Sequence, residues 1–404
     1  CPIYGIFNGE LAYNAANKKE EILMKRTMKK MVSMALTGTM AVAVLAGAGT
    51  REVKAADKAK IGVLVADVSG EEAQGFRSYY ENYIAGNYDV EFNYTDALQS
   101  AEDEKTAIEK FASQGCQAII SFSSNDRVQQ IETCEKYGVY YAVASGVLDD
   151  AQYETYKTYE YFAGQVGPGN DTEFEAGKDM GAYYKEQGVS KVAIYGAFIP
   201  NPMHVYRVAG VLNGLGCTYG GESDMNAIAG QIFQDQTVDL SKVEGDVEVV
   251  SYLQGYGDTT TDELNAAIQK TPDAFISVGM ATTFFAQSLS EAGISFSDID
   301  SFTQSNGEAI TNGKLVYLAG KYSSSVGPAF ALVLNAINGN VIRDEQGNAV
   351  SLSQNYQVAT DEATFDEFYK SDNGDNPIYN KETLDQIIGE SVTFDEINEL
   401  VTSK

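Results

Sequence analysis

The sequence predicts an α/β protein with two doubly wound parallel-sheet lobes, and three observations carry this prediction. Short apolar runs alternate with amphipathic segments of about 10–15 residues, which is typical of βαβ units in a parallel sheet. The same alternation restarts after Phe162, so we expect two lobes of similar size. The chain is 44% apolar and 11% aromatic, which is too much for a disordered chain and enough for two hydrophobic cores.

In the first half, each apolar run after Lys60 is followed by a helical pattern. We expect strands over 61–66, 90–94, 118–122 and 139–144, and helices over 71–84, 101–114 and 126–137. Acidic residues occupy the first turn of 101–114, where the helix dipole favours them. Tyr79, Tyr80 and Tyr83 have helical spacing, and we expect them to pack in the core rather than to form a ligand platform.

In the second half, the same pattern predicts strands over 191–196, 247–252, 274–278 and 299–304, and helices over 172–187, 203–214, 261–270 and 282–292. The glycine-rich stretch 164–170 lacks both GxGxxG spacing and the lysine of a P-loop. We therefore interpret it as a crossing segment that needs positive φ.

The region after residue 351 differs, because it predicts a short helical C-terminal extension over 361–369, 381–388 and 394–400. Asn380 and Thr393 are expected N-caps, and Thr393 with Glu396 forms a capping box.

The N-terminal region predicts export. Lys25 and Arg26 stand near the start of a basic stretch, an apolar run follows over 31–48, and Val53-Lys54-Ala55 has the form of a cleavage site. The run of about 18 residues is at the low edge of what spans a bilayer. We expect 24–55 to be a signal peptide, and 1–23, which begins with cysteine, to be a translated leader rather than native protein.

The stretch Leu45-Ala46-Gly47-Ala48 resembles the lipobox of bacterial lipoproteins, with Ala48 where the lipid-carrying cysteine would stand. A thioether to diacylglycerol needs a thiol, so we expect an exported protein, periplasmic or extracellular, without a lipid anchor.

The charge and the cysteines exclude several classes of function. A net charge of −29 repels phosphate backbones and anionic lipid surfaces, so we expect no nucleic-acid partner.

The expected mature chain has an odd number of thiols, Cys116, Cys134 and Cys217, with no CxxC spacing, which disfavours a disulfide framework and a zinc site. A bridge between Cys116 and Cys134 stays open, because both could lie at one end of a βα unit. We expect no metal and no cofactor.

His204 is the only histidine. It follows the expected strand 191–196 and so lies near the carboxyl edge of the sheet, either in a ligand pocket or as a structural loop residue. Nothing around it resembles a nucleophile elbow, which disfavours a catalytic base. The sequence therefore predicts no enzyme.

Four stretches carry a family resemblance: "QAIISFSSND", "VGPGNDTEFEAGKDM", "YRVAGVLNGL" and "NGKLVYLAGKYSSSVG". In this order and spacing, over roughly residues 58–350, the chain resembles type I periplasmic solute-binding proteins of ABC transporters, and the ribose-binding group in particular. The resemblance implies a monomer with lobe 1 over 58–162 plus 322–352 and lobe 2 over 163–321 plus 353–404. It also implies a hinge of three crossing segments, a ligand in the cleft, and a membrane permease that recognises the closed form.

The resemblance also implies a set of ligand-binding residues. Phe76 would stack on the ligand and Lys321 would supply charge, while hydrogen bonds would come from Ser69, Ser123, Asn125, Ser145, Asn170 and Gln304, with His204 nearby.

The chain departs from the sugar-binding pattern at several positions. Ser145 replaces an aspartate, Val205 replaces the pocket arginine, and Gly279-Met280 replaces an Asn-Asp pair. Lys321 is similar to a lysine of the basic-membrane-protein, nucleoside-binding branch. The ligand class stays open among sugars, nucleosides and carboxylates. A sensory module of the same fold is the alternative function, and a secreted α/β enzyme is the less favoured one.

Overall fold

The computed structural model describes residues 58–373 and 376–404. The expected leader (1–23) and signal peptide (24–55) lie outside these residues. No helix in the two described ranges combines the length and the apolar character needed to cross a bilayer.

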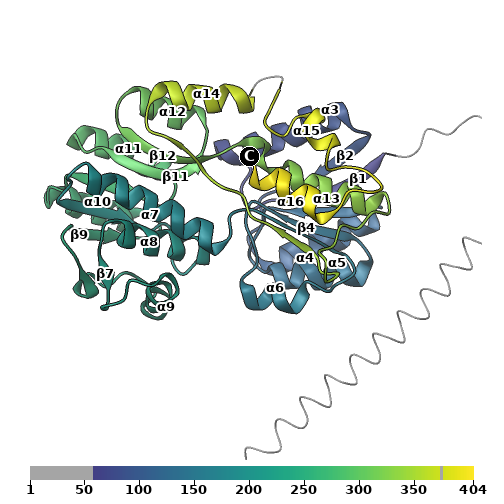
Figure 1. Cartoon of the computed structure of the whole chain (residues 1–404), viewed down its shortest axis with the longest axis horizontal. Coiled ribbons are helices and arrows are strands. Elements are labelled where there is room, and N and C mark those ends of the chain that lie inside the picture. Colours follow the sequence, from purple (N-terminus) through teal and green to yellow (C-terminus); the bar gives the residue numbers. More distant parts are fainter. Residues whose placement is uncertain (1–57, 374–375) are drawn as a thin grey trace, which may run out of the picture. The chain divides into compact units, whose positions relative to one another are not determined.

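The first lobe is built on a six-stranded parallel sheet in the order β13-β5-β4-β3-β1-β2; β1, β2 and β4 are labelled in Figure 1. Its strands are β1 (Ala59–Leu64), β2 (Val90–Tyr94), β3 (Ala118–Ser121), β4 (Tyr140–Ala144), β5 (Phe162–Val166) and β13 (Val350–Leu352). Its helices are α2 (Glu71–Ser78), which continues through η1 (Tyr79–Ile84) and α3 (Ala85–Asn87), then α4 (Ala101–Ser113), α5 (Arg127–Tyr137), α6 (Asp150–Tyr156) and α13 (Gly327–Ile337). All four residues of β3 are buried, as expected for a strand covered on both faces.

The second lobe contains the sheet β14-β12-β11-β10-β6-β9, which is parallel except for β14. Its strands are β6 (Lys191–Tyr195), β9 (Glu248–Leu253), β10 (Ala274–Ser277), β11 (Phe296–Ser301), β12 (Leu315–Lys321) and β14 (Gln357–Ala359). Its helices are α7 (Asn170–Glu186), α8 (Pro202–Gly214), α9 (Met225–Asp235), α10 (Asp258–Gln269), α11 (Ala281–Ala292) and α12 (Gln304–Thr311). A small ribbon of β7 (Thr218–Tyr219) and β8 (Val243–Glu244) completes it.

Glycines let α7 and α8 approach closely. A Cβ on Gly177 would lie 2.0 Å from the backbone oxygen of Arg207, and one on Gly210 would lie 2.0 Å from that of Phe174. Any larger residue would therefore push α8 away, and α8 carries side chains of the site described below.

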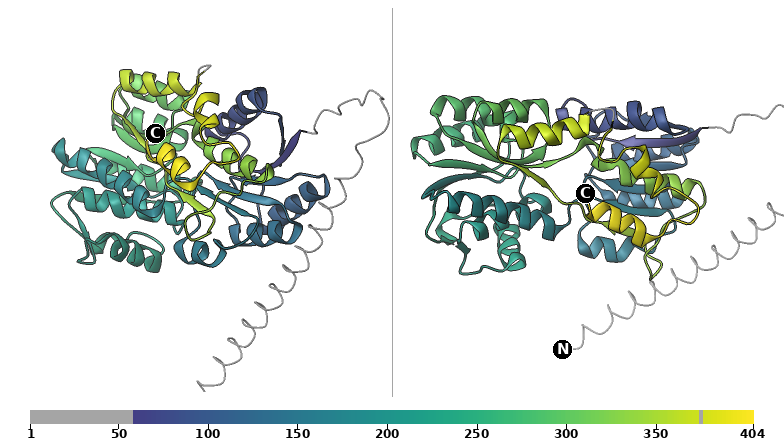
Figure 2. Two further views of the ribbon diagram at one scale, coloured as in Figure 1. Left: turned by 45° about the vertical axis from the view of Figure 1, so that its right-hand side comes forward. Right: turned by 45° about the horizontal axis from the view of Figure 1, so that its top comes forward.

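The chain crosses between the lobes after β5, after β12 through η3 (Ser323–Val326), and after β13. Helix α14 (Glu362–Asn373) then packs on α12 of the second lobe, while α15 (Lys381–Asp385) and α16 (Phe394–Thr402) pack on the first (Figures 1 and 2). Leu384, Ile397 and Val401 are buried in the same core as Phe330. The C-terminal segment thus returns to lobe 1.

The structure differs from the predicted boundaries in three places. Strand β5 belongs to lobe 1, so the first crossing follows Val166 rather than residue 162. The region 353–404, expected in lobe 2, divides between the lobes because α15 and α16 bury their apolar faces on lobe 1. Strand β11 begins and ends three residues earlier than the expected 299–304.

Several local predictions are confirmed. Asn380 and Thr393 cap their helices, and the capping box of Thr393 and Glu396 is present. Tyr79 and Tyr80 are buried and donate to backbone carbonyls, as expected for packing residues. The bridge between Cys116 and Cys134, which the sequence left open, is not formed: Cys116, Cys134 and Cys217 are all free and buried.

Candidate functional site

A cavity of about 660 Å³ lies where the carboxyl ends of strands from both sheets meet. Parallel strands present their carboxyl ends at one edge, where helices begin, so polar loop side chains gather there. Lobe 1 supplies the loops after β1, β3 and β4 and the start of α2. Lobe 2 supplies the loops after β10 and β11 and the starts of α8 and α11.

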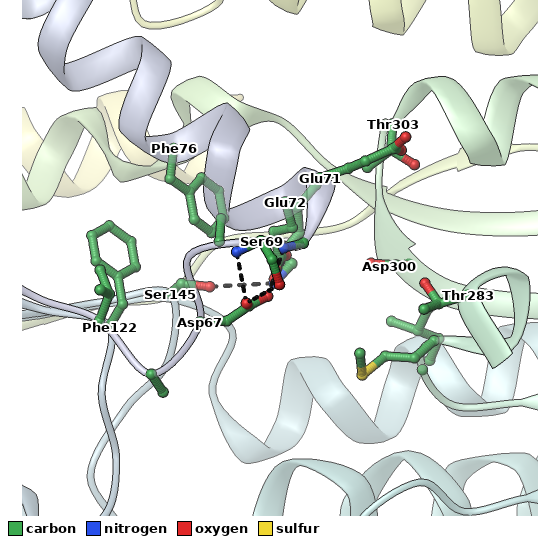
Figure 3. Close-up of a pocket in the computed structure, with 18 of the residues that line it drawn as sticks. Asp67, Ser69, Glu71, Glu72, Phe76, Phe122, Ser145, Thr283, Asp300 and Thr303 are labelled. Atoms are coloured by element: carbon green, nitrogen blue, oxygen red, sulfur yellow. Dashed lines mark hydrogen bonds and ion pairs between the residues drawn. The ribbon is translucent and has the colours of Figure 1, made fainter. Parts of the chain in front are cut away.

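Asp67 shapes the loop after β1. Its Oδ1 accepts hydrogen bonds from Ser69 N at 2.9 Å and Ser69 Oγ at 3.0 Å, and its Oδ2 accepts one from Gly70 N at 2.9 Å. These bonds hold Ser69 at the cavity wall (Figure 3). Because the Ser69 hydroxyl donates to Asp67, its oxygen is available to accept a bond from a ligand.

Two phenyl rings form an apolar wall on the lobe 1 side. Phe76 of α2 and Phe122 after β3 are stacked, with ring centroids 5.3 Å apart and planes inclined by 18° (Figure 3). Both line the cavity. Such a wall suits the flat apolar face of a ring-shaped ligand.

Arg127, the first residue of α5, also lines the cavity. Its Nη1 donates to the Val147 carbonyl at 2.6 Å, while its buried Nε has no hydrogen-bond partner among the described residues. Burial lowers the pKa of Arg127. The neighbouring Glu104 carboxylate is occupied elsewhere, because it accepts from Asn125 N and Asp126 N, both at 2.9 Å. Arg127 therefore retains donor capacity at the cavity wall.

Arg207 of α8 is a second cavity arginine, but its donors are used within the protein. Its Nε donates to Glu173 Oε2 at 2.6 Å and its Nη1 to the Val278 carbonyl at 2.7 Å, while Nη2 donates to the Tyr356 hydroxyl. Burial alone would lower the pKa of Arg207, but the charge of Glu173 outweighs it and raises the pKa. Arg207 therefore stabilises the cavity wall through bonds within the protein and has few donors left for a ligand.

His204 lines the cavity one turn before Arg207. Its Nδ1 accepts a hydrogen bond from Phe198 N at 3.2 Å. Burial, assisted by the charge of Arg207, lowers the pKa of His204 to about 3. The ring is therefore neutral at physiological pH and offers a polar edge rather than a charge.

Glu72 of lobe 1 and Lys321 of lobe 2 form an ion pair with a distance of 2.9 Å. Ser301 Oγ donates to Glu72 at 2.6 Å, and Lys321 Nζ donates to Ser145 Oγ at 3.3 Å. Burial would raise the pKa of Glu72, but the charge of Lys321 and the hydrogen bond from Ser301 lower it. The positive charge of Lys321 is thus balanced by Glu72 within the protein.

Asp300, at the end of β11, is the acidic counterpart of Arg127 on the other lobe. Burial and then the negative charge of Glu72 raise the pKa of Asp300 to about 6. Its Oδ1 accepts from Ser301 N at 2.8 Å. Since Lys321 pairs with Glu72, the Asp300 carboxylate keeps acceptor capacity toward the cavity.

Further buried polar atoms at the cavity lack partners. Tyr94 Oη, Thr282 Oγ1 and Asn306 Oδ1 have none within the described part of the chain. Buried polar groups are normally paired, so groups of this kind in a cavity wall indicate that a polar ligand completes them. Ser145 and Met280, both lining the cavity, also have left-handed φ angles of 57° and 68°, a strained conformation for non-glycine residues that the surrounding structure must hold in place.

The structure brings five of the nine predicted site residues to this cavity: Ser69, Phe76, Ser145, His204 and Lys321. Four others are not among its lining residues. The Ser123 hydroxyl donates to Glu104, and Asn125 N also bonds Glu104. Asn170 begins α7, and Gln304 faces a separate hollow beside α14, where its Nε2 donates to Glu308 at 2.9 Å.

Sequence reasoning missed Phe122, Arg127, Tyr94 and Asp300. Phe122 and Arg127 lie in or beside the stretch "SFSSND", whose strand-to-helix loop was the available signal. Asp300 was missed because the strand was placed three residues too late. The described residues also contain no group of three or more His, Cys, Asp or Glu side chains that could hold a metal ion.

No protein-family model and no curated protein matches the sequence, but solved structures match the fold. The arabinose-transporter binding protein from Shewanella sp. ANA-3, bound to L-arabinofuranose, has a TM-score of 0.56 at 16% identity, covering 78% of this chain and 95% of that one. A solute-binding protein from Bacillus halodurans with myo-inositol has a TM-score of 0.56 at 17% identity, covering 78% and 97%. One from Actinobacillus succinogenes with D-allose has a TM-score of 0.58 at 16% identity, covering 77% and 100%. The chain therefore has the type I periplasmic-binding-protein fold.

Proposed function

We propose that this protein is an exported solute-binding protein that captures a small polyhydroxylated ligand between its lobes and delivers it to an ABC-type permease. The observation that carries the proposal is the pair of charged side chains with free bonding capacity, Arg127 from lobe 1 and Asp300 from lobe 2. A ligand that bonds both must touch both lobes, so it stabilises the closed form.

The same pair favours a neutral sugar or cyclic polyol. Vicinal hydroxyls donate two hydrogen bonds to a carboxylate and accept two from a guanidinium, and these charged bonds are the stronger ones. The two opposite charges balance each other, so the ligand needs none of its own. The stacked rings of Phe76 and Phe122 would cover its apolar face. Nucleosides and carboxylates are the alternative ligands.

Permease delivery is favoured over signalling, because the solved structures with this fold include components of ABC transporters that hold sugars or inositol. A receptor could recognise the same closed form. Disruption of a permease gene next to the gene of this protein should abolish ligand uptake, whereas loss of a ligand response with intact uptake would support the sensory alternative.

The absence of a lipobox cysteine leads us to propose that the exported protein carries no lipid anchor. Phase separation in Triton X-114 tests this directly: the protein should remain in the aqueous phase, and tight partitioning into the detergent phase would contradict the proposal.

A ligand screen tests the main proposal. Thermal unfolding should be measured with millimolar L-arabinose, D-ribose, D-allose, D-galactose, myo-inositol, adenosine and D-gluconate. A ligand at 100 times its Kd stabilises by about 2.7 kcal/mol, which corresponds to a rise in Tm of several degrees. We expect such a rise for at least one sugar or polyol and its loss in Arg127→Met. An unchanged Tm with every compound would contradict the proposal.

A further inference from the structure

Lobe 2 carries a group of exposed aromatic side chains beside the cavity. Tyr256 is 73% exposed and Phe284 is 39% exposed, and the neighbouring Met280 is 36% exposed. Isolated exposed apolar residues are common on protein surfaces, but a contiguous group needs an explanation. We call Tyr256, Phe284 and the half-buried Phe198 the aromatic platform.

The platform forms one continuous set of ring contacts. The Phe198 and Tyr256 centroids are 5.7 Å apart in an edge-to-face arrangement, and Tyr256 and Phe284 are stacked at 6.5 Å with planes inclined by 13°. Phe198 also contacts the ring of His204, with centroids 5.7 Å apart. Because His204 lines the cavity, the platform adjoins the cavity through this ring contact, although its own three rings are not among the lining residues.

Sheet topology places the platform on the same edge as the cavity. The cavity uses the carboxyl ends of β12, β11 and β10, and the sheet order continues from β10 to β6 and β9. Phe198 follows β6 and Tyr256 follows β9, while Phe284 lies in the first turn of α11 after β10. The platform therefore extends the ligand-binding edge of lobe 2.

The backbone that presents Tyr256 is fixed. Gly255 N donates to the Ala197 carbonyl at 2.6 Å, and the Tyr195 hydroxyl donates to the Gly255 carbonyl at 2.8 Å. Gly255 and Gly257 have left-handed φ angles of 76° and 104°, which L side chains rarely adopt. These bonds and φ angles fix the backbone on either side of Tyr256, whose side chain is 73% exposed.

We infer that the ligand extends beyond the cavity and that a second sugar ring lies on Tyr256 and Phe284, so that the substrate class is an oligosaccharide or a glycoside. This inference rests on the proposed function. One sugar ring would bind in the cavity with hydrogen bonds to Arg127 and Asp300, and the second ring, joined to it by the glycosidic bond, would lie on the platform. A tyrosine suits this role because its ring packs on the C–H face of a sugar while its hydroxyl bonds water or a sugar hydroxyl.

Matched pairs of ligands test the inference. Calorimetry should compare D-glucose with cellobiose and maltose, D-galactose with β-1,4-galactobiose, D-xylose with xylobiose, and L-arabinose with α-1,5-arabinobiose. We expect one disaccharide to bind about tenfold more tightly than its monomer, which corresponds to the contribution of one well-placed ring contact. Tyr256→Ala should remove this gain while changing monosaccharide affinity less than about twofold.

Phe284→Ala provides a second variant, and Tyr137→Ala the matched control, because Tyr137 is also exposed (43%) but lies on α5 of lobe 1. Disaccharides that bind no better than their monomers would overturn the inference, as would a Tyr256→Ala variant that keeps the gain. A variant with normal sugar binding but impaired uptake would overturn it in favour of a protein partner. If neither the disaccharides nor the monosaccharides bind, the proposed function itself is wrong.

Discussion

Glu72 and Lys321 join the two lobes by an ion pair of 2.9 Å. The next residue toward the helix start, Glu71, accepts hydrogen bonds from Ser305 Oγ at 2.8 Å and Ser305 N at 3.2 Å, near the start of α12. The first turn of α2 in lobe 1 is therefore bound to lobe 2 at two points. Because these contacts cross the cleft, they influence the equilibrium between the open and closed forms.

Glu72→Gln should shift this equilibrium toward the open form. The variant loses the ion pair but keeps the shape of the side chain, and since Glu72 is partly exposed, the loss in stability should be at most about 1 kcal/mol. Small-angle scattering of the ligand-free protein should show a larger radius of gyration, which ligand reverses. Glu175→Gln is the control, because its partner Lys178 lies in the same helix of lobe 2. Equal radii for Glu72→Gln and wild type would contradict the prediction.

Phe76 should contribute to both stability and binding. Phe76→Ala removes a ring that is only 5% exposed, and truncations of this kind cost about 3–5 kcal/mol. Phe76→Leu retains most of the apolar volume, so it should cost much less stability while it still removes the stacked face shared with Phe122. Denaturant unfolding and calorimetry together separate these effects. If Phe76→Leu bound ligand as tightly as wild type, the stacking role would be wrong.

Arg127→Met should lose ligand affinity without losing stability. Within the described residues, the guanidinium is buried with an unpartnered Nε and a single hydrogen bond, to the Val147 carbonyl, so an apolar side chain of similar length removes a desolvation cost that offsets the lost bond. We expect an unchanged or higher Tm and at least about tenfold weaker binding, in line with the loss of a charge-assisted bond. Arg343→Met is the control, because Arg343 donates to three backbone carbonyls and should be destabilising when removed. A marked fall in the Tm of Arg127→Met would show a structural role instead.

The fold could be predicted from the sequence because strand and helix periodicities are local signals. Helices α6, α9, α12 and α13 were not predicted. Helices α15 and α16 were assigned to the wrong lobe, because their docking on lobe 1 depends on tertiary burial of residues such as Leu384 and Ile397. A periodic pattern shows that a helix has an apolar face but does not show which core receives it.

The candidate site was predicted only in part, for the same physical reason. Ser69 and Ser145 follow their strands directly, so their placement at the carboxyl edge could be inferred. Ser123 and Asn125 also follow a strand, but Glu104, about twenty residues earlier, takes their hydrogen bonds. Such a tertiary partner has no signature in the local sequence. A shift of three residues in β11 likewise hid Asp300.

Glu173→Gln should be strongly destabilising, because it leaves the buried Arg207 guanidinium without its counter-charge. Both side chains are only 4% exposed, and breaking a buried pair by removing one partner costs about 3–5 kcal/mol. Urea unfolding measures the effect. Glu173→Gln combined with Arg207→Met should recover part of the loss, since no unpaired charge remains. A double variant less stable than the single one would contradict this account.

Binding should weaken below about pH 6 because Asp300 takes up a proton. Its folded pKa of about 6 exceeds the ordinary value of about 4, so the folded protein binds this proton more tightly than the unfolded chain does. The contribution of Asp300 to stability is therefore greatest below pH 4 and is lost as the pH rises from about 4 to 6. Asp300→Asn should be more stable than wild type at pH 7, by about 2–3 kcal/mol, and this difference should nearly disappear near pH 4.

For the ligand the sign is opposite, because hydroxyls donate to the ionised carboxylate. Calorimetry between pH 4.5 and 7.5 should show a Kd that rises by up to about tenfold per unit below pH 6 in wild type, and a weaker but flat Kd in Asp300→Asn. His204→Gln should keep the wild-type slope, because the pKa of His204, about 3, leaves its ring neutral throughout this range. If the slope disappeared with His204→Gln and persisted with Asp300→Asn, His204 rather than Asp300 would be the group that takes up the proton, and the prediction would be wrong.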